Sequence, residues 1–213
     1  MKIKVAVLGV LICISCILAS ILSQVIFSHY LNGLFIKHAN FAEAGLDSKD
    51  SIEIATLISN YLLGRQNRFE VEGREDINSK FSKREVLHMQ DVRNIFLRIK
   101  YSFYLSSFLS VIFFFIVKGK ISVNKKYYFL GLIIPILIIS FISIFAAINF
   151  DKAFVILHKI IFTNDFWILK PGRDIIISFM PIELFFDMAK NMLLFFIILI
   201  IIFLIPLLRK CNN

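Results

Sequence analysis

YYFLGLIIPILIISFISIFAAI, residues 127–148, is an apolar run without a single charged side chain. An α-helix rises about 1.5 Å per residue, so a run of this length crosses a hydrocarbon layer of about 30 Å. Three further runs are nearly free of charge: residues 5–27, 101–117 and 188–208. The sequence therefore predicts four transmembrane helices, of which the one at 101–117 has the shortest apolar run.

The composition of the 213-residue chain agrees with this prediction. Apolar side chains make up 58% of the residues and the mean hydropathy is +0.79, whereas a soluble domain is about 45–50% apolar. The run at 5–27 follows two lysines, as in a signal peptide, but it is long and no A-x-A-like cleavage site follows it. We therefore expect an uncleaved anchor and an all-α membrane protein, with residues 1–213 forming a single integral membrane domain.

The distribution of charge predicts the orientation of the helices. Residues 1–4, 118–126 and 209–213 together carry eight lysines or arginines and no acid, while residues 28–100 and 149–187 together sum to zero. By the positive-inside rule, both termini and the middle loop are cytoplasmic and the two longer segments form an extracytoplasmic cap at the membrane interface. The net charge of +9 is therefore a topology signal, and it gives no support for a nucleic-acid partner.

The first outer segment contains an amphipathic pattern followed by a polar stretch. In DSKDSIEIATLISNYLLG, residues 47–64, apolar residues recur at helical spacing between acidic residues and Gly64, which predicts a helix. The stretch RFEVEG, residues 68–73, favours a short strand or hairpin.

A second helix of this segment is expected to lead into the second span. Ser82 and Glu85 have the spacing of a capping box, so the helix starts near residue 83. It carries EVLHMQDVR, residues 85–93, in which His88 and Asp91 are three apart and share a face. A straight helix would hold His88 about 20 Å above the membrane boundary. For this reason we expect a break or a tilted segment between Asp91 and Lys100.

The second outer segment places a histidine on an apolar helical face. In NFDKAFVILHKIIF, residues 149–162, apolar side chains stand three and four positions on either side of His158. This pattern predicts a short helix at the membrane surface. Trp167 follows, and tryptophan is typical of a membrane–water interface.

His88 and His158 can have either a structural or a chemical role. A histidine on an apolar face most often packs as a hydrogen-bonded core residue, and each of the two fits that interpretation alone. Both, however, are predicted on one side of the membrane with acids nearby. Neutral imidazole can take a proton from an amine nucleophile and return one to a leaving alkoxide. Asp91 is then the candidate to orient His88, and Asp165 or Asp174 the candidates to orient His158.

The remaining chemistry-bearing residues give no second site. His29 and His38 follow the first span with no clear partner and are interpreted as surface or interfacial residues. Cys13 and Cys16 lie inside the first span, where packing is the simplest interpretation. The sequence contains no GxSxG, HExxH or P-loop motif, and no metal or cofactor is indicated.

The motifs together resemble a known family. Four spans with both ends inside, EVLHMQDVR before the second span, and HxxxFxxDxWxLxP at 158–171 are similar to the lipoprotein intramolecular transacylases of low-GC Gram-positive bacteria. The positions of the second outer segment that carry the resemblance are His158, Phe162, Asp165, Trp167, Leu169, Pro171 and Asp174. Lys170 departs from the family, which commonly has Asp before this proline, so Lys170 receives no catalytic role.

The resemblance implies acyl transfer on the outer face of a bacterial plasma membrane. The substrate implied is a diacylglyceryl-modified lipoprotein, whose sn-2 fatty acyl ester moves to the α-amine of its N-terminal cysteine, giving an N-acyl lyso-form lipoprotein. The two functional histidines of the family map onto His88 and His158. Around them we expect Asp91, Asp165, Asp174 and Trp167 as supporting residues, with membrane lipid as the surroundings and no cofactor.

Two other classes stay open on the sequence alone. A non-enzymatic four-span accessory or sensor protein would use the same histidines only for packing, and their replacement would leave lipoproteins unchanged. A transporter fits less well, because the spans lack the intramembrane ionisable residues that mark transport pathways.

Overall fold

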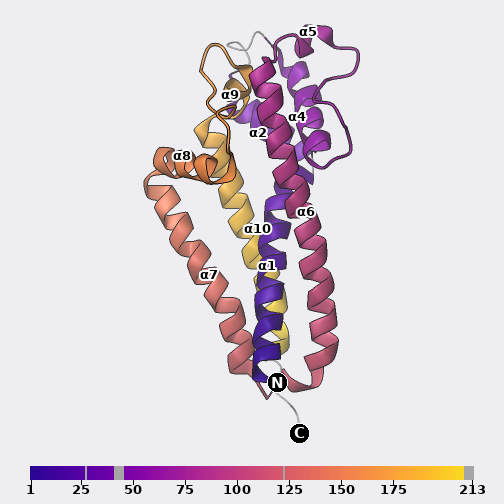
Figure 1. The fold of residues 1–213 in the computed structure, drawn as a ribbon, viewed down its shortest axis with the longest axis vertical. Coiled ribbons are helices and arrows are strands. Elements are labelled where there is room, and N and C mark those ends of the chain that lie inside the picture. The colour runs from indigo at the N-terminus through magenta and orange to yellow at the C-terminus, as the bar shows by residue number, and fades with distance from the viewer. Residues whose placement is uncertain (27, 41–45, 122, 209–213) are drawn as a thin grey trace. The chain divides into compact units, whose positions relative to one another are not determined.

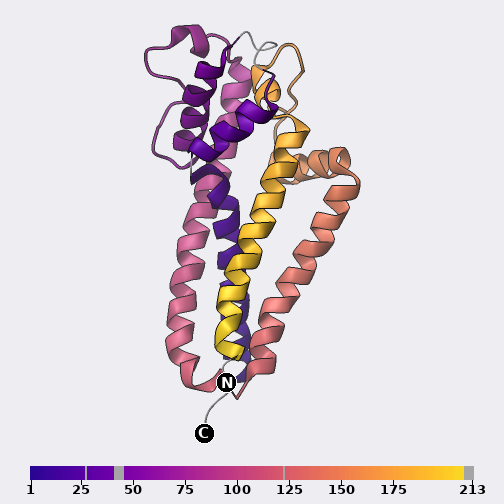
Figure 2. The same ribbon diagram turned by 180° about the vertical axis from the view of Figure 1, so that it is seen from behind.

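The regular structure of the chain is helical wherever it is described. The structure, a computed structural model, describes residues 1–26, 28–40, 46–121 and 123–208, and no strand occurs among them. Figures 1 and 2 show the helices from opposite sides. Their bounds are α1 Lys2–Ile26, α2 Ser28–His38, α4 Ser48–Leu62, α5 Glu75–Asn78, α6 Lys83–Val117, η1 Lys118–Lys120, α7 Lys125–Ile148, α8 Phe150–Ile161, α9 Ile175–Phe179 and α10 Ile182–Leu208.

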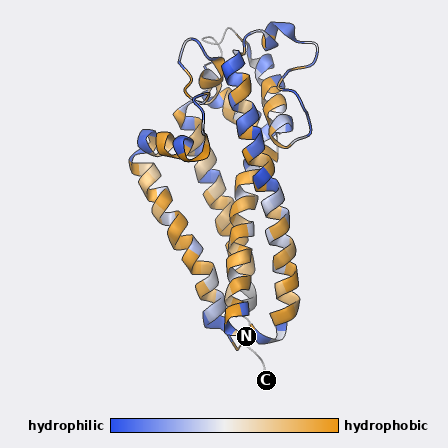
Figure 3. Cartoon of the chain, viewed as in Figure 1, coloured by the Kyte–Doolittle hydropathy of each residue, from blue (hydrophilic) through white to orange (hydrophobic). Residues whose placement is uncertain are grey.

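Four helical stretches are long and apolar enough to cross a membrane. They are Lys2–Ile26, Lys83–Lys120, Lys125–Ile148 and Ile182–Leu204. In Figure 3 the hydrophobic colour covers most of α7 and the lower part of α6, while polar colour recurs along the upper part of α6. The predicted all-α membrane fold with four spanning helices is confirmed.

The expected break before the second span is wrong. α6 runs without interruption for 35 residues, and it contains neither glycine nor proline, the residues that most often end or kink a helix. Its charged part is also held by partners: Arg93 Nε donates to the carbonyl oxygen of Tyr61 (3.0 Å) and Lys100 Nζ donates to that of Leu63 (2.7 Å). These bonds satisfy carbonyls at the C-terminal end of α4, where helices leave acceptors unpaired.

The chain folds as two compact units. The first unit comprises Met1–Ser20, Tyr101–Leu157 and Leu194–Asn213, and the second comprises Ile21–Lys100 and His158–Leu193. In the first unit α1 crosses α7 closely, since a Cβ added to Gly131 would overlap the carbonyl oxygen of Ala6, and one added to Gly9 would overlap that of Tyr128. Such small-residue crossings are typical of membrane helices, whose backbones then approach each other. Cys13 and Cys16 are buried in this unit as packing residues, and Cys211 lies outside the described residues.

The second unit has its own apolar core. α2 packs on α4, and the core around them includes the fully buried side chains of Phe35, Ile54 and Ile58. The predicted helix at 47–64 is confirmed as α4, with Asp47 and Asp50 forming a capping box at its start. Gly64 follows the helix with φ of +74°, a left-handed conformation that glycine adopts without strain.

The expected strand or hairpin at 68–73 is wrong. Residues 65–74 form turns and bends. Some of their backbone groups are hydrogen-bonded by side chains, whereas in a strand they would pair with the backbone of a neighbouring strand. The amide of Asn78 donates to the carbonyl oxygen of Val71 and accepts from the Val71 N–H, both at 2.8 Å. Arg74 then joins this loop to α4 by hydrogen bonds to Asp50 (2.7 Å) and Glu53 (2.6 Å).

Candidate functional site

The candidate site begins at the N-terminal end of α6. The predicted capping box is confirmed: Ser82 N–H donates to Glu85 Oε2 (2.7 Å) and Glu85 N–H donates to the Ser82 hydroxyl oxygen (3.3 Å). The cap fixes where the helix starts and therefore which residues face the interior of the second unit. One turn after Glu85, His88 is buried with 9% of its surface exposed.

The second unit brings the two predicted histidines together. The ring centroids of His88 and His158 are 6.0 Å apart, although the residues are far apart in the chain. Phe162 packs against both imidazoles, with its ring centroid 5.3 Å from that of His88 and 5.5 Å from that of His158. The ring centroids of Trp167 and His158 are 5.0 Å apart. The four rings form a continuous cluster, which we call the histidine cluster.

His88 is held in its neutral form by its surroundings. Burial lowers the pKa of His88 and the neighbouring His158 lowers it further, to about 4, against a smaller opposing effect of Asp91. His88 belongs to the charged part of α6, which precedes the uncharged run 101–117. Within the described part of the chain, no hydrogen-bond partner reaches its buried Nδ1 atom. Because an unpaired buried nitrogen is costly, this atom is a place where a ligand's polar group would be favoured.

Asp91 is tied to the loop that follows α8. The Asn164 amide donates to Asp91 Oδ2 (2.8 Å), and its oxygen accepts from the Phe166 N–H (3.0 Å). Asn164 thus links the acid on α6 to the backbone next to Trp167. Asp91 lies close enough to His88 to act on its pKa, but the sequence did not indicate the amide that holds it.

Asp174 has partners other than the histidine it was expected to orient. Its side chain accepts from Lys170 N–H (2.7 Å), from the Arg173 guanidinium (2.7 Å) and from the Ser82 hydroxyl (3.1 Å). Burial raises the pKa of Asp174, but the bonds from Arg173, Lys170 and Ser82 outweigh burial and hold it below its ordinary value. The structure therefore places Asp174 as an anchor of the turn at 170–174.

Glu85 makes the second anchor between α6 and the same loop. Its side chain is fully buried, and besides closing the capping box it accepts from the Ile176 N–H at 2.7 Å, across 91 residues of sequence. Arg84 adds a bond from its guanidinium to the carbonyl oxygen of Asp165 (2.8 Å). Asp165 is itself exposed and takes part here through its backbone. We call Glu85 and Asp174 the loop clamp.

The remaining predicted residues lie outside the histidine cluster. Lys170 is exposed and contributes its backbone N–H to the loop clamp. His38 has a partner that the sequence did not reveal: its Nε2 lies 2.9 Å from Asp187 Oδ2, which also pairs with Lys37. His29 is exposed. Among the described residues, no group of three or more His, Cys, Asp or Glu side chains is arranged to hold a metal ion.

These observations define a class: a polytopic membrane protein with paired imidazoles suited to proton transfer. The chain matches the model of the family described as "lipoprotein intramolecular transacylase Lit" over residues 6–186. The protein belongs to the Lit family and is an enzyme, an acyltransferase. The resemblance drawn from the sequence is confirmed, and the alternative of a non-enzymatic accessory or sensor protein is not favoured.

Solved structures agree with this assignment. The in meso structure of the membrane-integral lipoprotein intramolecular transacylase Lit from Bacillus cereus is 26% identical, with a TM-score of 0.78 over 94% of this chain and 90% of that chain. A variant of that protein with one histidine replaced by arginine gives a TM-score of 0.73 at 25% identity, over 94% of this chain and 87% of that chain. Among curated protein sequences, none matches.

Glu85→Gln is expected to displace the loop that carries Trp167. A glutamine has one acceptor oxygen, so it keeps one of the two bonds from N–H groups and places its NH₂ group against the other N–H, where donor faces donor. A shift of about 1 Å in a site of this kind lowers turnover by up to about 100-fold. We expect a 10- to 100-fold lower kcat at nearly unchanged KM, together with greater quenching of Trp167, the single tryptophan, by acrylamide. Glu183→Gln, at an exposed acid, is the control, and unchanged quenching in Glu85→Gln would contradict the clamp.

Acid is expected to destabilise the protein through His88. The pKa of His88 is about 4 in the folded protein against the ordinary 6.5, so between these values the unfolded chain binds a proton that the folded protein does not. The free energy of unfolding therefore falls as the pH falls through this window, by roughly 3 kcal/mol at most. In detergent, the Tm of the unmodified protein should drop more between about pH 7 and about pH 4 than that of His88→Gln. Parallel curves for the two proteins would show that His88 is not held neutral, and His29→Gln should follow the unmodified protein.

Proposed function

We propose that this enzyme moves the sn-2 fatty acyl chain of a diacylglyceryl lipoprotein to the α-amine of the lipoprotein's N-terminal cysteine. The observation that carries the proposal is the pairing of His88 and His158 in one aromatic cluster. Membership of the Lit family supports lipoprotein as the substrate. The product is an N-acyl lyso-form lipoprotein with the same number of acyl chains as its precursor.

His158 is the residue proposed to meet the substrate. His158 is half-buried, whereas His88 is buried with 9% of its surface exposed. His158 belongs to α8, on which Ile156, Leu157 and Ile160 are exposed, so the histidine shares a helix with side chains suited to lipid contact. The ester of a membrane-anchored substrate is therefore expected to approach His158 first.

The reaction needs two proton transfers and no external acyl donor. The neutral α-amine attacks the ester carbonyl carbon, its nitrogen loses one proton as the N–C bond forms, and the glycerol oxygen gains one proton when its bond to that carbon breaks. His158 removes the first proton, and the His88–His158 pair returns one to the leaving oxygen, so atoms and charge balance over the cycle. Transfer by way of an acyl-histidine is the alternative route.

The intramolecular nature of the transfer reduces what the enzyme must supply. Donor and acceptor belong to one molecule, and direct attack passes through an eight-membered ring of N, Cα, Cβ, S, two glycerol carbons, O and the acyl carbon. Holding these atoms in a near-attack geometry contributes several kcal/mol to lowering the barrier. Trp167 is therefore proposed to shape the site through its contact with His158. Asp91 is proposed to orient His88 through its electrostatic field.

The site is proposed to lie on the extracytoplasmic side of the bacterial plasma membrane. The support is the charge count, eight basic residues against no acid in residues 1–4, 118–126 and 209–213. Reporter fusions at Asn124 and Asn213 should read cytoplasmic, and fusions at Asn78 and Thr163 external. An external reading at Asn124 would place the histidines on the cytoplasmic side and overturn this assignment.

A lipopeptide assay tests the reaction itself. Purified protein is incubated with a synthetic diacylglyceryl lipopeptide and no phospholipid, and the product is followed by mass spectrometry before and after base treatment. We expect unchanged mass with one chain now base-resistant as an amide. His88→Gln and His158→Gln, which keep much of the side-chain volume, should each lower turnover by about 10² to 10⁴-fold.

Three outcomes separate the parts of this proposal. His29→Gln, at an exposed histidine of the same outer segment, is the control and should retain full activity. A product that gains a third chain would show that phospholipid is the acyl donor. Full activity in the double variant His88→Gln/His158→Gln would remove the histidine mechanism while leaving the acyl transfer in place.

A further inference from the structure

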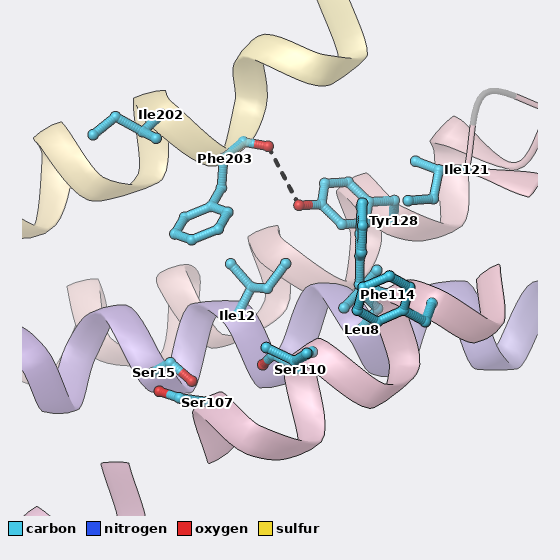
Figure 4. A pocket seen from close by; sticks show the side chains of 12 residues that line it. Leu8, Ile12, Ser15, Ser107, Ser110, Phe114, Ile121, Tyr128, Ile202 and Phe203 are labelled. Atoms are coloured by element: carbon cyan, nitrogen blue, oxygen red, sulfur yellow. Dashed lines mark hydrogen bonds between the residues drawn. The ribbon is translucent and has the colours of Figure 1, made fainter. Parts of the chain in front are cut away.

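The first unit contains a cavity that has no part in the proposed reaction. It measures about 590 Å³, within the usual range of small-molecule sites, and α1, α6, α7 and α10 all contribute to its walls (Figure 4). Ile12, Phe114 and Phe203 are among the apolar side chains that line it. All lining residues belong to the first unit, while the histidine cluster belongs to the second.

Three of the four hydroxyl groups in the walls, those of Ser15, Ser110 and Tyr128, are hydrogen-bonded to the protein, and the fourth belongs to Ser107. The Ser15 hydroxyl donates to the Leu11 carbonyl oxygen (2.9 Å), and the Ser110 hydroxyl donates to that of Ser106 (2.7 Å). The Tyr128 hydroxyl donates to the Phe203 carbonyl oxygen at 3.3 Å, the bond drawn in Figure 4. With these donors engaged, the interior presents mainly hydrocarbon and suits an aliphatic chain better than a polar ligand.

One side of the cavity is bordered by cationic residues. Lys118 is exposed, and its Nζ lies 5.3 Å from the centroid of Phe115, a lining residue. Two further lining residues, Ile121 and Tyr128, come from residues 118–128, where four lysines occur without an acid. The Nζ atom of Lys2 lies 5.5 Å from the ring centroid of Tyr127, the chain neighbour of the lining residue Tyr128.

We propose that this cavity binds one acyl chain of an anionic phospholipid, with the phosphate group of that lipid at Lys118. An apolar interior next to a cationic border matches a ligand that joins a hydrocarbon chain to a negative head group. Lysine-rich segments beside membrane spans attract anionic lipids in this way. A zwitterionic lipid has the same acyl chain but no net negative charge, so it should bind more weakly. The diacylglyceryl group of a lipoprotein has acyl chains but no phosphate, so it should also bind more weakly.

Lipid retention by the full-length protein tests the proposal. Delipidated protein in detergent is mixed with equal amounts of phosphatidylglycerol and phosphatidylcholine of the same chains, and bound lipid is counted by native mass spectrometry. Since one lysine near an anionic head group is worth about a fivefold change in binding, we expect phosphatidylglycerol to be retained at least about fivefold better. Lys118→Gln should bring the two lipids close to equal retention, while Lys152→Gln, at another exposed lysine of the first unit, should leave the preference unchanged.

Variants that fill the cavity give an independent check. Val111 lines the cavity, so Val111→Trp should lower phosphatidylglycerol retention to that of phosphatidylcholine, as should Ser110→Phe. Leu105 is exposed on the same helix and does not line the cavity, and Leu105→Trp should bind as the unmodified protein does. Each variant is compared only if it elutes as a single peak at the unmodified volume, and two filling variants guard against one failing to fold. Equal retention of both lipids by the unmodified protein, displacement of phosphatidylglycerol by the phosphate-free lipopeptide, or normal retention by both filling variants would overturn the proposal.

Discussion

The candidate site depends on one buried carboxyl group, that of Glu85. Its two oxygens accept from N–H groups that open two different helices, Ser82 N–H at the start of α6 and Ile176 N–H at the start of α9. Helix N-termini leave such donors unpaired and carry partial positive charge, so an acceptor between two of them satisfies both. The cost of burying the acid is offset only while both bonds hold. Because His88 lies one turn beyond Glu85 and Trp167 lies in the loop that ends at α9, one interaction fixes both sides of the histidine cluster.

The same burial that builds the cluster determines its chemistry. Aromatic rings around His88 remove it from water and lower its pKa, and the second imidazole acts in the same direction. A base has to be unprotonated before it can accept a proton, and the lowered pKa keeps His88 unprotonated at neutral pH, although it also makes His88 a weaker base than an ordinary imidazole. The Nδ1 of His88, which has no hydrogen-bond partner among the residues that the structure describes, is a further cost of this arrangement. Local costs of this kind are common where a protein's stability is traded for function.

The sequence predicted the features that depend on local periodicity and failed where distant partners decide. The spans, the helix at 47–64 and the Ser82–Glu85 cap follow from spacing alone, and all are present. The break in α6 was expected because a straight helix would hold His88 far above the membrane boundary, but α6 is continuous, and Arg93 and Lys100 bind the carbonyls at the end of α4. No local pattern could have revealed these bonds, or that of His38 with Asp187, because their partners are 32 to 149 residues away.

The placement of the supporting acids shows why proximity in sequence is a weak guide to a site. Asp165 and Asp174 stand close to His158 in the chain, yet Asp174 bonds to Ser82, 92 residues away, and Asp165 is held through its backbone by Arg84. Asp91 acts on a histidine of the cluster through its electrostatic field at His88. An intramolecular transfer requires the substrate to be folded into one geometry more than it requires many reacting groups. In the proposed mechanism Glu85, Asp174 and Arg84 accordingly position the loop, and the two imidazoles are left to move protons.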